Sequence, residues 1–384
     1  MDAQGPAPAT EAGHQSLTTS TLNRIAAFRE RHAKAEIALF FTAGFVFDVV
    51  TLDRIDNWKN LLQQGLYLVV LGGLLLFEQR YRLTGDRPPR ALGLLWRFHE
   101  DASHFLIGSL LSSFALFFFK SASGISAFIF FVVIFGLLVA NELPRFRSLG
   151  PVIRYGLYAL SLTSFFSYLL PVVFGRIGWW LFVLAVAVSV APFVLLYRKA
   201  VAWAEDRKVA LRQVAAPAAA VQLLLLVLYF VGAIPPVPLS LQYIGVFHDV
   251  KNVAGQFELS HETPSWKFWE RGDQTFRARP GDKVFIFARV FAPMTVGKGN
   301  LPIEFRWFYD HPKHGWQPAG SWTYTGLVGG RAEGFRVFAT RSDPKPGDYR
   351  VEITAPDGRE IGRIGFTVVE DHSDEPRVFV VDRG

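Results

Sequence analysis

The segment HEDASH, His99–His104, carries the residue types best suited to acid-base or metal chemistry. It resembles the zinc motif HExxH, but its two histidines are five residues apart. That spacing sets them about 140° apart around a helix, so one regular helix cannot direct both at one metal. Glu100, Asp101 and His104 do share a helix face, and Glu142 approaches them if two neighbouring apolar segments form a hairpin.

These four residues are the candidate catalytic site, and the sequence leaves two interpretations open. In the first, the cluster holds a divalent metal or performs acid-base chemistry on a lipid-linked substrate. In the second, its carboxylates pair with Arg97, Arg145 or Arg147 and with the N–H groups at the helix start. We expect the second, and therefore predict neither a metal nor a cofactor.

Tryptophans in the C-terminal part are the candidate ligand-binding residues. Exposed aromatic rings stack on sugars or bury a patch against a protein partner. The candidates are Trp266, Trp269, Trp316 and Trp322. The chain shows no Ser-His-Asp set, phosphate-binding glycine loop or nucleotide fingerprint.

Long apolar segments must position the HEDASH cluster. Val214–Ile234 is uncharged and, at about 1.5 Å per residue, long enough to cross a bilayer. Pro217 is expected in its first turns, and Pro235-Pro236 is expected to stop it. Six further apolar segments precede it, and seven spans is the simplest count: Ile37–Leu52, Leu61–Phe77, Ala102–Phe119, Ile125–Ala140, Val152–Phe174 and Ile177–Tyr197. The first of these is short and contains Asp48, so a re-entrant or interfacial segment is the alternative there.

The distribution of basic residues predicts the orientation of these spans. If the N-terminus is cytoplasmic, the inner segments hold about 17 Lys or Arg, whereas the outer ones hold only Arg54, Lys59, Lys120 and Arg176. An odd number of spans then places the C-terminus outside. The span-end tryptophans are expected at the membrane interface: Trp58, Trp96, Trp179, Trp180 and Trp203.

Composition narrows the class of protein. Residues 1–234 contain 21 Lys or Arg and 14 Asp or Glu, whereas residues 235–384 contain 19 of each, so the net charge of +7 belongs to the apolar part. Membrane topology explains that charge, and we therefore predict no nucleic-acid binding. The chain has no cysteine, which excludes disulfides and thiolate sites.

After Pro238 the pattern changes to alternating side chains, which is typical of half-buried strands. Turn signals separate these segments at Pro280–Asp282, Pro346–Asp348 and Asp357-Gly358. Seven or eight short strands predict an antiparallel immunoglobulin-like β-sandwich, with a closed barrel as the alternative. The predicted strands are KVFIFARVF, IEFRWFY, GFRVFAT, YRVEIT and IGFTVV.

Both parts resemble a family of bacterial polytopic membrane proteins whose C-terminal domain of unknown function is numbered 2914. Tyr349 stands where the family pattern has Trp, and the resemblance implies no activity. The residues that carry it in the C-terminal part are Trp307, Gly329-Gly330-Arg331, Gly334-Phe335-Arg336, Gly347–Val351, Asp357-Gly358 and Phe366. In the apolar part they are GFVFD, ending at Asp48, and Asn141–Pro144.

The sequence therefore predicts three regions: a flexible cytoplasmic tail (1–35), a helical transmembrane domain (36–236) and a periplasmic β-sandwich (237–384). We expect a multi-pass protein of a bacterial cytoplasmic (inner) membrane, surrounded by lipid, whose β domain binds an envelope protein or glycan. The alternative is a membrane enzyme acting on a lipid-linked substrate near His104, and a transporter is the third hypothesis.

Overall fold

The computed structural model describes residues 55–142, 150–264, 266–267, 269–293, 301–324 and 334–383. The predicted tail, the first apolar segment with Asp48, and the predicted ion-pair partners Arg145 and Arg147 lie outside these residues. The Glu142 side chain also lies outside the description.

Six of the predicted apolar segments form helices. Five helical stretches are long and apolar enough to cross a membrane, whereas the apolar part of α4, Ala127–Asn141, is shorter. The number of membrane crossings therefore stays a prediction. The helices are α2 (Trp58–Thr84), α3 (Gly93–Ser121, after a 3₁₀ turn at Arg90–Leu92), α4 (Gly124–Glu142), α6 (Pro151–Phe174), α7 (Trp179–Trp203), α8 (Arg207–Ala210) and α9 (Ala216–Phe230).

Two tight turns join helices into antiparallel hairpins, as the glycines predict. The helix α3 ends at Ser121 and α4 begins at Gly124. Between α6 and α7, Gly175 takes a φ of 64°, a left-handed conformation that glycine adopts without steric cost.

The last helical stretch begins and ends earlier than predicted. Helix starts at Arg207, so Pro217 lies well inside the stretch. A π-helical turn, Leu211–Ala215, precedes Pro217 and accommodates a residue that has no N–H to donate. The helix already ends at Phe230, because Gly232 turns the chain with a φ of 74° before Pro235 is reached.

The helical region is apolar outside and partly polar inside. Leu66, Val69 and Leu223 are exposed although they are large and apolar. Inside, the buried Gln222 amide donates to the Ser189 hydroxyl at 2.9 Å, and that hydroxyl also contacts Thr163. This arrangement is expected of helices whose outer faces contact lipid and whose polar groups bond across helices.

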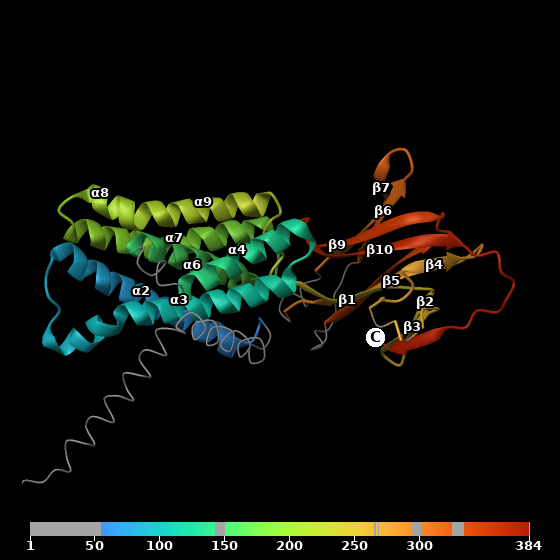
Figure 1. Cartoon of the computed structure of the whole chain (residues 1–384), viewed down its shortest axis with the longest axis horizontal. Coiled ribbons are helices and arrows are strands. Elements are labelled where there is room, and N and C mark those ends of the chain that lie inside the picture. Colours follow the sequence, from blue (N-terminus) through green and yellow to red (C-terminus); the bar gives the residue numbers. More distant parts are fainter. Residues whose placement is uncertain are drawn as a thin grey trace, which may run out of the picture. The chain divides into compact units, whose positions relative to one another are not determined.

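The two ends of the helical region differ in charge. At one end α2 and α7 finish and α3 and α8 begin, and the adjoining residues include Arg82, Arg87 and Lys208 (Figure 1). We call this the basic end. At the other end lie the two glycine-containing turns and the last residues of α9, from which the chain continues to the β domain.

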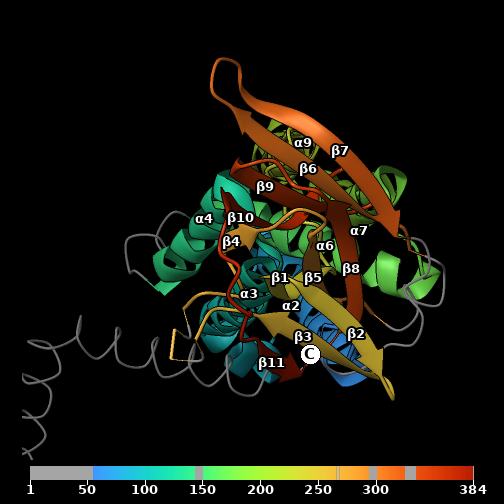
Figure 2. The ribbon, with the colours of Figure 1, turned by 90° about the vertical axis from the view of Figure 1, so that its right-hand side faces the viewer.

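The β domain contains eleven strands in the part that the structure describes. They form sheets in the orders β1-β5-β8, β4-β10-β9-β6-β7 and β11-β3-β2 (Figure 2). The strands are β1 (Ser240–Phe247), β2 (Asp249–Val253), β3 (Gln256–His261), β4 (Thr275–Ala278), β5 (Lys283–Phe291), β6 (Ile303–His311), β7 (Gly315–Tyr324), β8 (Phe335–Ser342), β9 (Gly347–Thr354), β10 (Glu360–Glu370) and β11 (Val380–Arg383).

The first two sheets pack face to face as a sandwich. Ile286 and Val337 of one sheet and Phe305, Val351 and Phe366 of the other belong to one buried core. The neighbours β10, β9 and β6 take the places of strands G, F and C in an immunoglobulin-like sheet, and β4 adds to the edge in parallel with β10. All five strands named from the sequence are present.

The third sheet was not predicted. Its strands β2, β3 and β11 are short, and their exposed residues break the alternation that marks longer strands.

 In the structure, the buried side chains of Phe247, Val250 and Leu259 pack with Phe287 of β5 in a second, smaller core, which attaches this sheet to the sandwich.

Candidate functional site

A buried ion pair lies at the basic end of the helices. The Arg154 guanidinium of α6 donates from Nη2 to Oε1 of Glu78 on α2 at 2.5 Å, and both side chains are only 3% exposed. Its Nη1 lies 3.4 Å from Oε1 of Glu100 on α3, whose side chain is 60% exposed. One arginine therefore joins three helices, and we call Glu78, His99, Glu100 and Arg154 the Arg154 cluster.

The His99 ring is fixed by its own helix. Its Nδ1 donates to the Trp96 carbonyl oxygen at 2.6 Å, and the ring stacks on the Trp96 indole with 4.6 Å between centroids. Since a carbonyl can only accept, Nδ1 carries the hydrogen in this contact. The lone pair of the neutral ring is then on Nε2.

The Arg154 cluster has donor types that suit a metal ion. One ligand atom each from Glu78, His99 and Glu100 lie within 4.8 Å of one another. The carboxylates of Glu78 and Glu100 already contact the Arg154 guanidinium, so this cationic side chain occupies the position between them. The arrangement therefore fits an ion pair that holds helices together better than a metal centre.

The predicted site residues do not all meet in this cluster. Glu100 contacts Arg154 on α6, whereas buried His104 contacts α4: its Nδ1 lies 3.2 Å from Asn141 Oδ1, and Asn141 Nδ2 donates to the His104 carbonyl at 3.1 Å. Asp101 is exposed on the surface of α3.

Arg97 is one of the three arginines predicted as partners of these carboxylates, and the other two, Arg145 and Arg147, lie outside the described residues. The Arg97 guanidinium lies over the Phe98 ring at 5.5 Å, and the arginine that pairs with Glu100 is Arg154. Glu78 and Arg154, which lie 76 residues apart, were not predicted as site residues. The sequence signal that could have identified them is one acidic and one basic residue, each near the end of an apolar segment.

The four tryptophan candidates lie on two elements of the β domain. Trp266 and Trp269 are exposed in the loop after β3, with ring centroids 5.6 Å apart. Asp273 fixes the base of this loop by accepting hydrogen bonds from the backbone N–H groups of Glu262 and Thr263. Trp316 and Trp322 are exposed on β7, an edge strand.

Trp316 and Trp322 lie on opposite faces of the β6–β7 hairpin. Trp322 is opposite Phe305, a core residue, whereas Trp316 is opposite Asp310. A bulge at Trp307/Phe308 shifts the register between these pairs and so changes the face that β7 side chains share with β6. The two rings therefore do not form one flat platform for a sugar.

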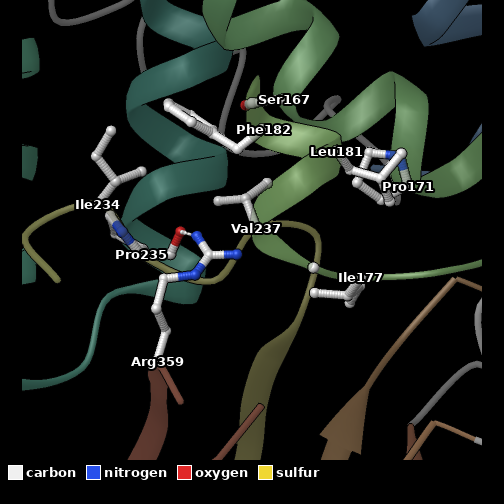
Figure 3. A pocket seen from close by; sticks show the side chains of 10 residues that line it. Ser167, Pro171, Ile177, Leu181, Phe182, Ile234, Pro235, Val237 and Arg359 are labelled. Carbon is white, nitrogen blue, oxygen red and sulfur yellow. Dashed lines mark hydrogen bonds between the residues drawn. The ribbon is translucent and has the colours of Figure 1, made fainter. Parts of the chain in front are cut away.

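Hydrogen bonds also join α9 to the turn between β9 and β10. The Tyr229 hydroxyl donates to Asp357 Oδ2 at 3.0 Å, and Arg359 Nη1 donates to the Pro235 carbonyl at 2.8 Å (Figure 3). Arg359 also pairs with Asp357 at 2.7 Å. Burial by itself raises the pKa of the Asp357 carboxyl, but the Arg359 guanidinium and the hydrogen bonds outweigh it and lower that pKa.

Two cavities adjoin this contact. The smaller, drawn in Figure 3, has a volume of about 10 Å³, which is about the volume that one water needs, between Leu181, Val237 and Arg359. The larger has a volume of about 530 Å³, and we call it the junction groove. Its walls include the helix ends at Ile125, Trp179 and Phe230 and the charged residues Asp357, Arg359, Glu360 and Arg363.

Comparison with known proteins gives little further information. No family model matches the chain, and no curated protein matches it. Among solved structures, the chain is similar to an immunoglobulin-like protein from Pseudomonas aeruginosa, with 10% identity over 33% of this chain and 97% of that protein, at a TM-score of 0.19. The sheet order and the shared core therefore define the fold of the β domain.

Proposed function

We propose that this chain is a multi-pass protein of a bacterial cytoplasmic membrane, and that its helices hold the β-sandwich on the periplasmic side, where it binds a protein of the cell envelope. The apolar outer faces of the helices support insertion into lipid. The basic end supports the orientation, because Lys and Arg gather on the cytoplasmic side of membrane proteins. The resemblance to the family numbered 2914 agrees with this proposal.

Reporter fusions test the orientation. Alkaline phosphatase folds to an active form only outside the cytoplasm, so a fusion after Asp249 should be active and a fusion after Arg207 should be inactive. The reverse result would contradict both the orientation and the periplasmic location of the β domain.

The single observation that favours a protein partner is the edge strand β7. Its residues are exposed along most of its length, and Trp316 and Trp322 extend from opposite faces. The β6–β7 hairpin extends beyond the neighbouring strands (Figure 1). A sugar ring stacks on one flat face, whereas a protein can contact both faces of a hairpin and pair with its open edge.

Photo-crosslinking in cells tests this proposal. We expect a photoreactive residue at Gln317 on β7 to give one discrete protein adduct, and the additional substitutions W316A and W322A to reduce it about tenfold or more. Lys251 on β2, whose side chain is 71% exposed, is the control position and should give no discrete adduct. Equal adducts at both positions, or none at Gln317, would contradict a protein partner.

The alternative of a membrane enzyme is not favoured by the site geometry. The carboxylates of the Arg154 cluster are engaged by a guanidinium, and His104 is engaged by Asn141. These contacts suit a structural role.

A further inference from the structure

The junction groove has an apolar wall and a charged wall at one end of the helices. We propose that it binds the headgroup of a zwitterionic bilayer phospholipid. This inference rests on the proposed insertion of the helices into a membrane, because the groove would then lie where the headgroups of the outer leaflet lie.

The apolar wall is formed by the ends of helices. Ile125 begins α4, Trp179 begins α7, and Phe230 with Val231 ends α9. All four side chains are exposed, although each is large and apolar. Such a surface favours the glycerol and upper acyl region of a lipid over a soluble ligand, because burying it removes apolar area from water.

The charged wall belongs to β10 and the turn before it. Arg359 is fully engaged, since it contacts Asp357 and the Pro235 carbonyl and lies over the Tyr229 ring at 4.6 Å. Arg363 is different: its side chain is 42% exposed, and its contacts with Glu360 and Glu352 use Nε and Nη2. Nη1 takes no part in these contacts, so it can donate to a ligand phosphate.

The carboxylates of the groove determine which type of headgroup fits there. Asp357 and Glu360 balance the charges of Arg359 and Arg363, so these four residues together have no net charge. A purely anionic headgroup would match only the arginines of this set, whereas a phosphate joined to an ammonium group matches both signs. The phosphate would bind Arg363, and the ammonium would lie near Glu360.

Two further residues favour binding of this ligand in the groove. The Ser123 hydroxyl donates to Glu360 Oε1 at 2.6 Å, which holds that carboxylate beside the helix ends. The exposed Trp179 ring provides an aromatic face of the kind that attracts ammonium groups. The groove volume of about 530 Å³ lies within the usual range for small-molecule sites.

Lipid retention by the full-length protein tests the proposal. The protein is incorporated into nanodiscs of equimolar phosphatidylethanolamine and phosphatidylglycerol, released into detergent, and the lipids that remain bound are counted by native mass spectrometry. We expect phosphatidylethanolamine to be retained about tenfold over phosphatidylglycerol, and R363Q to abolish that preference. Added phosphoethanolamine without acyl chains should not displace the lipid.

Arg306 offers a matched control. Its side chain is also 42% exposed and is paired with a nearby carboxylate, Glu304, but it does not line the groove. R306Q should therefore keep the wild-type preference. An unchanged preference in R363Q would overturn the site, and equal retention of both lipids would overturn the zwitterionic headgroup.

The same experiment separates this inference from the proposed function. If the wild-type protein resists alkaline extraction from membranes but shows no lipid preference, the groove assignment fails and membrane insertion stands. If the protein is extracted by alkaline carbonate, insertion itself fails. Displacement by free phosphoethanolamine would show a soluble ligand and would also overturn the proposal.

Discussion

The helical region and the β domain each bury a carboxylate beside a basic side chain, but with different outcomes. In the helical region, Glu78 and Arg154 form a close ion pair. In the β domain, His248 Nε2 lies 3.5 Å from Asp273 Oδ2, and both side chains are buried. Burial lowers the pKa of the His248 imidazole to about 4, although the Asp273 charge acts in the opposite direction. His248 is therefore neutral at pH 7.

The difference follows from the donors that each backbone offers. Backbone N–H groups inside a helix are used by the helix itself, so Glu78 must find its donors on side chains, and it uses Arg82 and Arg154. Asp273 lies beside a loop with free N–H groups and accepts from Glu262 and Thr263. A carboxylate satisfied in this way does not require a protonated histidine.

The largest expected effect is on the helical ion pair. Removing the cation in R154M leaves the buried Glu78 carboxylate without its closest partner, and we expect the free energy of unfolding to fall by about 3–5 kcal/mol. Thermal unfolding of the full-length protein in detergent measures this change. The double substitution E78Q/R154M should recover part of the loss, because no unpaired charge then remains.

Arg82 provides the control for that prediction. It contacts the same Glu78 oxygen at 2.9 Å, but its side chain is 43% exposed. R82M should therefore lower the free energy of unfolding by less than about 1 kcal/mol. Equal losses in R82M and R154M would show that burial does not increase the contribution of the ion pair to the free energy of unfolding.

The same contrast explains what could be predicted from the sequence. Glycine-containing turns and alternating strands are local signals, and they identified the helix hairpins at Ser121–Gly124 and Gly175–Gly178 and the five long strands. The Glu78–Arg154 pair depends on which helices become neighbours, which no local pattern encodes. The HEDASH motif named Glu100 correctly as a residue that needs a partner, but the partner came from α6.

The second prediction concerns His248 and pH. The unfolded chain binds a proton near pH 6.5, whereas the folded protein binds it only near pH 4, so the unfolded state holds more protons between these values. The stabilising contribution of neutral His248 is complete above pH 6.5 and is lost as the pH falls towards 4. The loss amounts to about 3 kcal/mol in total, at about 1.4 kcal/mol per pH unit.

Urea unfolding of the full-length protein between pH 7.5 and 4 measures this slope. H248Q removes the titrating group and should flatten the pH dependence, although Glu262, whose pKa is raised by burial, leaves a residual slope. His372 has an exposed side chain, and H372Q is the matched control that should keep the wild-type slope. A wild-type slope in H248Q would contradict the assignment.

The smallest expected effect concerns Arg359, where the helical region and the β domain meet. R359Q removes the ion pair with Asp357 and the hydrogen bond to the Pro235 carbonyl, and we expect a loss of about 2 kcal/mol. Because these contacts join the two regions, the loss should separate their unfolding transitions, which calorimetry of the full-length protein detects.

R306Q, at a paired but exposed arginine, should change the free energy of unfolding by less than about 0.5 kcal/mol. If R359Q lowers stability without separating the transitions, Arg359 stabilises the β9–β10 turn alone, and the two regions are coupled by the apolar contacts of Ile177 with the β-domain core instead.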